Sequence, residues 1–420
     1  MQSEAARSLM ELRDLATVRD IESRAAGAAV APRLRVNAHL HLPPNFSAFQ
    51  SVRQAVELAA AQGIGVLGAS NYYDYEVYGA FSRLAQGHGI VPLYGLEIIC
   101  LLSDLQGKGA KLNDPGNPGK LYLCGKGITR FAAMTPEARA VLEQIRRNDS
   151  TRTAGVVHRL AGVFAQRGVP TGLTESAVID RVVQRHGCPR HCVYLQERHV
   201  CQAFQERFFE LVPPAERIEK LAMVLGAAPE AAPDDAVRIQ NEIRAHLLKA
   251  GKPAYVPETF VGFDAAIRLI TELGGIPCYP TLADGASPIS PFEDPAEDLV
   301  GRIRKWNIGC AEFIPQRNRP EVLSRYARAM RSAGIILTAG TEHNTLELLP
   351  IEPACLGGAP IPDEAKAIFW EGACVVAAHQ FLTLHGLDGF VAGCGEQRIA
   401  HLARIGGAVI QAYRNRYAPN

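Results

Sequence analysis

The stretch Arg35-Val36-Asn37-Ala38-His39-Leu40-His41 predicts a short strand that ends in two histidines. A strand turns alternate side chains to opposite faces, so Asn37, His39 and His41 share one face and the apolar side chains share the other. Pro43-Pro44 then ends the strand, at the edge of the sheet where α/β folds place their catalytic and binding residues. Two imidazoles on one face are suited to zinc, iron or manganese. The alternative is a pair of histidines that are each hydrogen-bonded in a polar core.

The composition is that of an ordinary soluble globular protein. The chain has 420 residues, which is enough for a large barrel with an insertion, and it is 47% hydrophobic and 21% charged with a net charge of +1. No dense basic run with interleaved aromatic residues occurs, so we expect no extended nucleic-acid surface. The sequence shows no secretory signal, no run of about 20 apolar residues and no disulfide spacing among its ten cysteines. We therefore expect a cytoplasmic protein that does not enter a membrane.

Four segments follow from the pattern of helices and strands. Residues 1–32 predict a helical arm for packing or for subunit contact, which leaves a homo-oligomer open. Residues 33–129 alternate strands and helices, residues 130–253 predict helices alone, and residues 254–420 resume the alternation and end in helices. The two α/β blocks predict one parallel sheet or barrel closed around a shared rim, with residues 130–253 as a helical insertion.

Two further strands carry candidate metal ligands. Glu97 lies within an apolar strand at residues 90–100, where a carboxylate is costly unless it meets a cation or several donors. A second hydrophobic strand, at residues 335–340, leads directly into Glu342 and His343. Together with the two histidines, these residues supply oxygen and nitrogen ligands from several strand ends, which is the requirement of a metal centre.

The order of these motifs resembles the polymerase and histidinol phosphatase (PHP) superfamily of metal-dependent phosphoesterases. The similarity covers about residues 34–129 and 254–345 and implies a distorted (β/α)7 TIM-like barrel. On this resemblance, the metal ligands are His39 and His41 from the His-x-His motif, Glu97 as a bridging glutamate, and Glu342 with His343 as the final acid-histidine pair.

The chain departs from the family pattern at three expected imidazoles. Asn71-Tyr72 stands where an Asp-His pair is usual, Tyr122 lies near a histidine position, and Cys278-Tyr279-Pro280 replaces a His-Pro motif. Tyrosine is a poor ligand for zinc or manganese at neutral pH because its pKa is near 10. We therefore expect one divalent ion (Zn, Mn or Fe) per chain. Tyr72 and Tyr279 become candidate general acids or hydrogen-bond donors to a polyol; the alternative is that they fill space in an inactive relative.

The insertion contributes two further catalytic candidates, Arg198 and His199. They stand in a Glu-Arg-His-Val segment that resembles one in the PHP nucleotide and oligonucleotide phosphoesterases, and the resemblance places them over the barrel mouth against a substrate anion. A solvated helix face is the alternative. Nearby cysteines and histidines leave open a separate structural zinc, although their spacing matches no ordinary zinc motif. They are His186, Cys188, His191, Cys192, His199 and Cys201.

These observations predict a metal-dependent hydrolase, a phosphoesterase that uses metal-activated water on a small anionic substrate. Two alternatives remain open. A single metal also suits a lyase or isomerase that acts on a sugar or hydroxy acid, and a PHP relative can keep the barrel without turnover.

Overall fold

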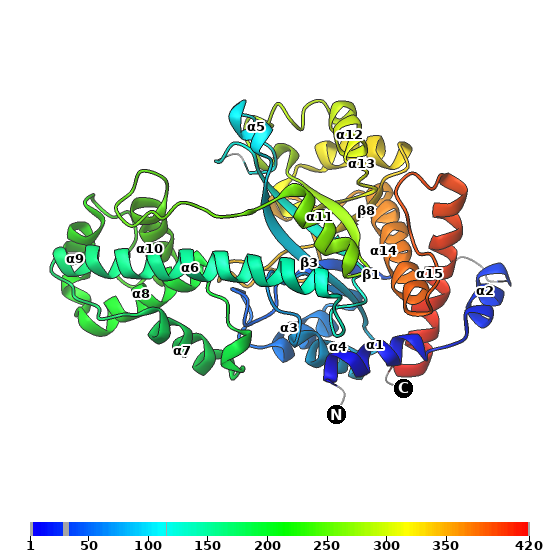
Figure 1. Ribbon diagram of the computed structural model, residues 1–420, viewed down its shortest axis with the longest axis horizontal. Coiled ribbons are helices and arrows are strands. Elements are labelled where there is room, and N and C mark those ends of the chain that lie inside the picture. Colours follow the sequence, from blue (N-terminus) through cyan, green and yellow to red (C-terminus); the bar gives the residue numbers. More distant parts are fainter. Residues whose placement is uncertain (1–2, 28–32, 115, 419–420) are drawn as a thin grey trace. The chain divides into compact units, whose positions relative to one another are not determined.

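The computed structural model describes residues 3–27, 33–114 and 116–418, and its first compact unit is built around a curved sheet (Figure 1). The strands follow the order β1-β2-β3-β4-β6-β7-β8, with the short β5 paired to β3. The bounds are β1 (Arg35–Leu40), β2 (Ile64–Ala69), β3 (Val91–Leu101), β4 (Lys120–Lys126), β5 (Val261–Gly262), β6 (Ile276–Thr281), β7 (Cys310–Phe313) and β8 (Ile336–Ala339).

The last strand closes on the first through backbone hydrogen bonds. The amide of Glu342 donates to the carbonyl of His39 at 3.0 Å, and the amide of His41 donates to the carbonyl of Glu342 at 2.8 Å. The sheet is thus a nearly closed barrel of seven strands, and the predicted distorted TIM-like barrel is confirmed.

One strand runs against the predicted direction. β4 is antiparallel to both β3 and β6, whereas the sequence predicted a parallel sheet throughout. The reason is the connection: the only helix between β3 and β4 is α5 (Ser103–Gly107), which is too short to carry the chain back along the sheet as the crossover helix of a parallel pair does. The loop therefore returns the chain beside β3 in the opposite direction.

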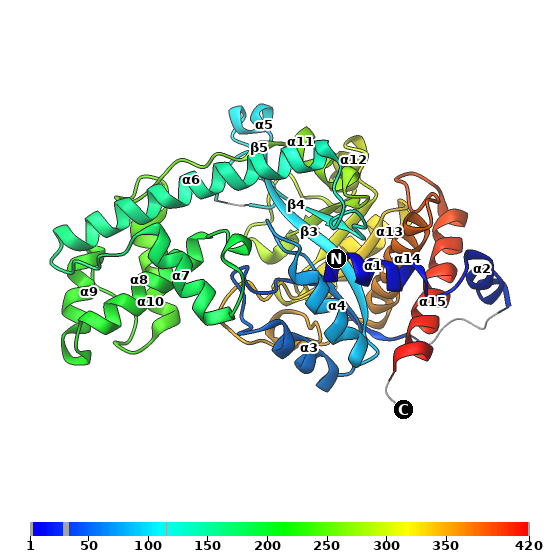
Figure 2. The ribbon, with the colours of Figure 1, turned by 60° about the horizontal axis from the view of Figure 1, so that its bottom comes forward.

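Amphipathic helices cover the barrel. In α3 (Val52–Ala61), the apolar positions Ala55, Val56 and Ala59 are buried, and the Ser51 side chain accepts from the Gln54 amide to begin the helix. Figure 2 shows α3 and α4 side by side beneath the sheet. The remaining helices of this unit are α1 (Glu4–Arg13), α2 (Val18–Gly27), α4 (Val77–Gly87), α11 (Phe263–Glu272), α12 (Ala296–Lys305), α13 (Pro320–Ser332), α14 (Asp363–Leu384) and α15 (Glu396–Tyr417). The predicted arm is thus two helices as far as Gly27; residues 1–2 and 28–32 of that prediction lie outside the described residues.

Helix α14 is long and apolar enough to cross a membrane by length and composition, and 67% of its most apolar window is buried inside the protein. It lies between β8 and α15 (Figure 1). A Cβ added at Gly372 would stand 1.8 Å from the Leu337 carbonyl oxygen of β8, and one added at Gly406 of α15 would stand 1.7 Å from the Cys374 carbonyl oxygen. The backbone of α14 thus lies very close to β8 on one side and to α15 on the other, as expected of a helix in the protein core.

The second compact unit comprises residues 43–50 and 143–260 and is helical. It is built on the continuation of α6 (Pro136–Gln166), with α7 (Glu175–His186), α8 (Glu197–Leu211), α9 (Arg217–Leu225) and α10 (Ala236–Ile243) around an apolar core. Phe164 and Phe204 pack in that core with ring centroids 5.2 Å apart. Arg152 and Arg244 both pair with Glu197, at 2.6 and 3.0 Å.

Gly372→Ala should destabilise the protein by about 2–3 kcal/mol or more, because the added methyl group overlaps a strand carbonyl that cannot move freely. Gly301→Ala is the matched control: Gly301 also lies inside a helix, and a Cβ there meets nothing within 4 Å. That substitution should stabilise by about 0.5–1 kcal/mol. Urea unfolding of both variants measures the difference, and equal stability of the two would contradict the close packing of α14 on β8.

Candidate metal centre

Three potential ligand atoms converge at the end of β1. The Nε2 atoms of His39 and His41 lie 3.3 Å apart, and each lies 3.3 Å from Oε2 of Glu97 on β3. The three residues are almost fully buried, with exposed fractions of 1%, 0% and 4%. The strand pattern accounts for the arrangement, because β1 sends both imidazoles to its inner face and β3 sends Glu97 to the same interior.

This triangle fits a metal ion. Ligands about 2.1 Å from a tetrahedral ion stand about 3.4 Å apart, and the three edges of the triangle are each 3.3 Å. Two histidines and one carboxylate are a ligand set that catalytic zinc sites use, with a fourth position left for water or substrate. His39, His41 and Glu97 could therefore hold one divalent cation.

A buried lysine and a second glutamate support His39 from the other side. Oε1 of Glu312 on β7 lies 2.9 Å from Nδ1 of His39, and Oε2 lies 2.6 Å from Nζ of Lys126 on β4. A carboxylate that accepts the Nδ1 proton leaves Nε2 as the electron-pair donor and fixes the ring. His39, Cys124 and Glu312 also form a group of metal-ligating type. The Lys126 ammonium already supplies a positive charge there.

The charges in this interior shift the pKa values of its members. Burial alone raises the pKa of Glu97, but hydrogen bonds from the two imidazoles outweigh it and hold that pKa well below its usual range. Burial likewise opposes ionisation of Glu312, yet Lys126 and His39 lower its pKa to about 2. Burial lowers the pKa of His39, and the Glu312 carboxylate reverses this and raises it to about 9. At neutral pH both carboxylates are therefore charged and His39 is protonated, so a cation that binds Nε2 of His39 would displace its proton.

Tyr72 lies at this cluster. Its hydroxyl donates to Oε1 of Glu97 at 2.5 Å, and its ring stacks on His41 with centroids 5.0 Å apart and planes 2° from parallel. Burial and the Glu97 charge raise the pKa of Tyr72 well above 10, so the phenol stays protonated. Tyr72 therefore orients Glu97 so that Oε2 faces the histidines.

Glu342 and His343 lie beside the cluster but use their side chains differently. Both residues adopt left-handed backbone with φ of 57° and 54°, which turns the chain away after the barrel has closed. The Glu342 carboxylate pairs with Arg317 and accepts from Asn344. The ring nitrogens of His343 contact Thr341 Oγ1 at 2.7 Å and the Leu349 carbonyl oxygen at 2.9 Å. Neither joins the triangle of ligand atoms.

The structure does not bring Tyr279 to the cluster. Cys278, its neighbour on β6, faces Lys126 and Glu312, so Tyr279 points to the opposite face of the strand. There its hydroxyl donates to Glu293 at 2.8 Å. Tyr279 is thus a buried residue of the helix-facing layer, where burial raises the pKa of Glu293 to about 7.

Arg198 and His199 lie in the first turn of α8, in the second unit. His199 is buried, its Nδ1 accepts from the Gln196 amide at 3.0 Å, and its ring meets Phe46 edge-on. Burial lowers the pKa of His199 to about 3, so it is neutral and serves the start of the helix. Arg198 is partly buried, and its predicted contact with a substrate anion stays a prediction. Among the other cysteines and histidines of this segment, His186 contacts the Gln50 carbonyl oxygen at 2.8 Å.

Lys126 and Arg317 are residues of this candidate site that sequence reasoning missed. Lys126 ends the strand Lys-Leu-Tyr-Leu-Cys-Gly-Lys, whose period of two places it on the same face as Tyr122 and Cys124. That alternation was an available signal, although it does not identify the partner. Arg317 follows β7 in a short turn, Pro315–Arg317, and nothing in its local sequence points to Glu342.

Comparison with solved structures supports the barrel. The chain is similar to an amidohydrolase from Chromobacterium violaceum with bound sulfate, at 15% identity and a TM-score of 0.50, over 80% of this chain and 96% of that one. It is also similar to a protein from Bifidobacterium adolescentis that is provisionally named a metal-dependent phosphoesterase, at 15% identity and a TM-score of 0.51, over 81% and 97%. No family model matches the chain, and no curated protein matches it by sequence. At this identity the likeness shows the fold.

Glu312→Gln should destabilise the protein by about 3–5 kcal/mol, because it leaves the Lys126 ammonium buried without a counter-charge. Lys126→Met should cost a similar amount for the converse reason. The double variant should be less destabilised than the sum of the two, by about 1–3 kcal/mol, since the two groups contact each other. Urea unfolding of the four proteins of this cycle tests it, and strict additivity would show that the two side chains do not interact.

Proposed function

We propose that the chain is a metal-dependent hydrolase that cleaves a phosphoester in a small anionic substrate, with one divalent ion held by His39, His41 and Glu97. The observation that carries the proposal is the triangle of their donor atoms, with all three edges at 3.3 Å. Bound there, a divalent cation would bring a coordinated water towards a neutral pKa and polarise a phosphoryl oxygen.

The protein groups around the triangle have separate tasks. Glu312 accepts the Nδ1 proton of His39, and Lys126 holds Glu312 in its ionised form. The Tyr72 hydroxyl donates to Oε1 of Glu97, which leaves Oε2 available to the ion. The near-complete burial of the donor atoms excludes bulk water, which strengthens every charge interaction in the site.

The family resemblance and the structural neighbours support hydrolysis in general. One neighbour is called an amidohydrolase and the other a metal-dependent phosphoesterase. The choice of a phosphoester over an amide rests on the order of the His-x-His, Glu97 and Glu342-His343 motifs. Zinc, manganese and iron all suit two imidazoles and a carboxylate.

A lyase or isomerase that acts on a sugar or hydroxy acid is the second candidate. The observation in its favour is Lys126, which places a fixed positive charge beside His39, Cys124 and Glu312, the other metal-ligating group in this interior. That charge disfavours a second cation in this group. Because a single ion cannot clamp both the attacking and the leaving oxygen as a two-metal site does, a reaction that needs only one ion is favoured.

His39→Ala combined with His41→Ala should abolish bound metal, because two of the three donors are lost. Elemental analysis by plasma mass spectrometry should find one ion per chain in the unaltered protein and none in the double variant. His343→Ala is the matched control: its ring nitrogens contact Thr341 and Leu349, so its metal content should not change. Unchanged metal in the double variant would overturn the site, and loss of metal in His343→Ala would add that residue to the ligands.

Assays on the metal-loaded protein separate the proposed reactions. Release of phosphate from phosphomonoesters or phosphodiesters, absent in the double variant, is expected. Turnover of sugar acids or polyols without phosphate release would instead establish the lyase or isomerase. Bound metal without turnover of any substrate in these panels would favour the inactive relative.

Tyr72→Phe should lower metal affinity roughly 10- to 100-fold while leaving the fold intact, because it removes the donor that orients Glu97 and keeps the ring that stacks on His41. Competition with a metal-binding dye measures the affinity. Tyr279→Phe removes a hydroxyl remote from the cluster and should leave metal affinity unchanged. An equal loss in both variants would show that Tyr72 has no specific role.

A further inference from the structure

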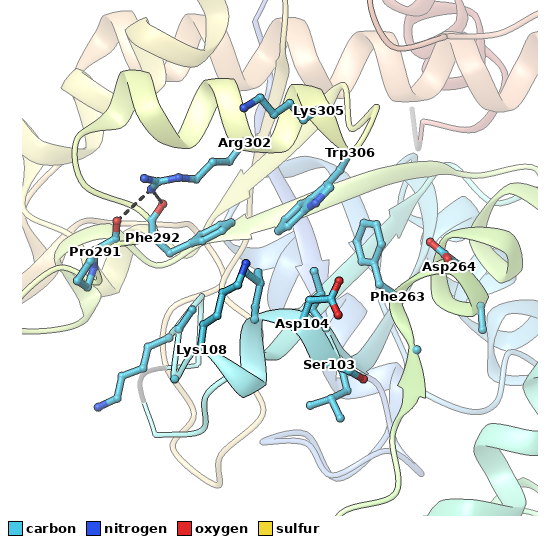
Figure 3. Close-up of a pocket in the computed structure, with 18 residues that line it drawn as sticks. Ser103, Asp104, Lys108, Phe263, Asp264, Pro291, Phe292, Arg302, Lys305 and Trp306 are labelled. Atoms are coloured by element: carbon cyan, nitrogen blue, oxygen red, sulfur yellow. Dashed lines mark hydrogen bonds between the residues drawn. The ribbon is translucent and has the colours of Figure 1, made fainter.

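A cavity of about 1040 Å³ opens on the barrel unit (Figure 3). Its walls come from the end of β3 with α5, from the start of α11, and from α12 with the loop before it. Neither the histidines of β1 nor Glu97 lines it. Its volume is that of a pocket for a small organic ligand.

Three aromatic rings form one wall. Trp306 lies between Phe292 and Phe263 (Figure 3), with ring centroids 5.4 Å and 5.1 Å away. Phe292 and Trp306 are within 17° of parallel. All three rings are partly exposed, so the ring surface that does not pack against a neighbouring side chain is available to a planar ligand.

Contacts within the protein hold this aromatic wall in place without a ligand. The Arg302 guanidinium donates to the carbonyl oxygens of Pro291 and Phe292 and lies over the Phe292 ring, 5.2 Å from its centroid. Arg302 also pairs with Asp298 at 3.5 Å, so its charge is committed to the protein. A preformed wall saves a ligand the cost of ordering it.

Three lysines contribute positive charge to the lining of the pocket. Lys108, Lys111 and Lys305 line the pocket and are exposed, and within the described residues they make no ion pair. Asp104 and Asp264 are the acidic residues of the lining. Three uncommitted ammonium groups against two carboxylates favour an anion, and the carboxylates are suited to accept hydrogen bonds from amino groups.

We propose that this pocket binds a nucleotide, with the base on the Phe263–Trp306–Phe292 rings and the phosphate on the lysines. Stacking of a base on aromatic side chains is sequence-tolerant and strong, and ammonium groups are common phosphate ligands. An apolar ligand would leave the three ammonium groups without a function, and a phosphorylated sugar alone would leave the rings unused. The site is independent of the proposed metal chemistry.

Trp306 provides the direct test, because the chain has two tryptophans and the other, Trp370, is in α14. In a Trp370→Phe protein, adenosine 5′-monophosphate should quench the fluorescence of Trp306 in a saturable manner. Ribose 5-phosphate and adenosine should each bind more weakly, because one lacks the base and the other the phosphate. Affinity should fall as salt is added.

Two further variants localise the binding. Lys108→Ala with Lys305→Ala should weaken binding of adenosine 5′-monophosphate about tenfold, whereas Lys366→Ala, an exposed lysine of α14 outside the pocket, should not change it. His39→Ala with His41→Ala should bind the nucleotide as the unaltered protein does, which separates this site from the metal centre. Absence of quenching by adenosine, guanosine, cytidine and uridine monophosphates, or equal affinity in the double lysine variant, would overturn the proposal.

Discussion

The ion pair between Lys126 and Glu312 is the interaction on which the barrel interior depends. Glu312 is fully buried on β7, and a carboxylate in that position is tolerated only because Lys126 stands 2.6 Å from one oxygen and His39 stands 2.9 Å from the other. The three residues come from β4, β7 and β1, so the pair ties together strands from across the sheet. It also determines which nitrogen of His39 faces Glu97. The stability of the fold and the orientation of the candidate metal ligand His39 therefore depend on the same ion pair.

Much of the barrel could be predicted from the sequence, because its strands are short apolar runs between amphipathic helices. The strand predicted at residues 90–100 is observed one residue later, as β3, and the strand predicted at residues 335–340 is one residue shorter at each end, as β8. The direction of β4 could not be predicted in this way. Periodicity within a strand reports which side chains share a face, but the direction of a strand depends on its connection, and the loop before β4 contains a helix of only five residues. That direction matters, since it pairs Cys124 with Glu97 and Lys126 with Gly95, which places the Lys126 side chain on the same interior face as Glu97.

The candidate metal ligands likewise fall into two groups, those that the structure brings together and those that it places elsewhere. His39, His41 and Glu97 follow from alternation along strands, and the structure brings them together. Glu342 and His343 lie after the strand has ended, where two successive left-handed residues set the direction of their side chains. Such a conformation is uncommon for residues with a Cβ and leaves no periodic signal. Tyr279 shows a further limit: the family motif aligns by sequence, but alternation along β6 turns Cys278 to the interior and Tyr279 to the opposite face, where it bonds Glu293.

Strand β3 contributes to both proposed sites. Glu97 lies near its middle and faces the two histidines, whereas Leu101 ends the strand and lines the ring-walled pocket. Four residues of extended chain span about 13 Å, so the proposed nucleotide on the Trp306 wall and the proposed ion at Glu97 would lie well apart in one barrel. The two proposed sites also differ in exposure. The candidate metal ligands are almost fully buried, which limits their contact with bulk water, whereas the rings of the pocket wall are partly exposed. The antiparallel β4 pairs with β3 from Gly95 to Leu101, so the same ladder holds both positions in register.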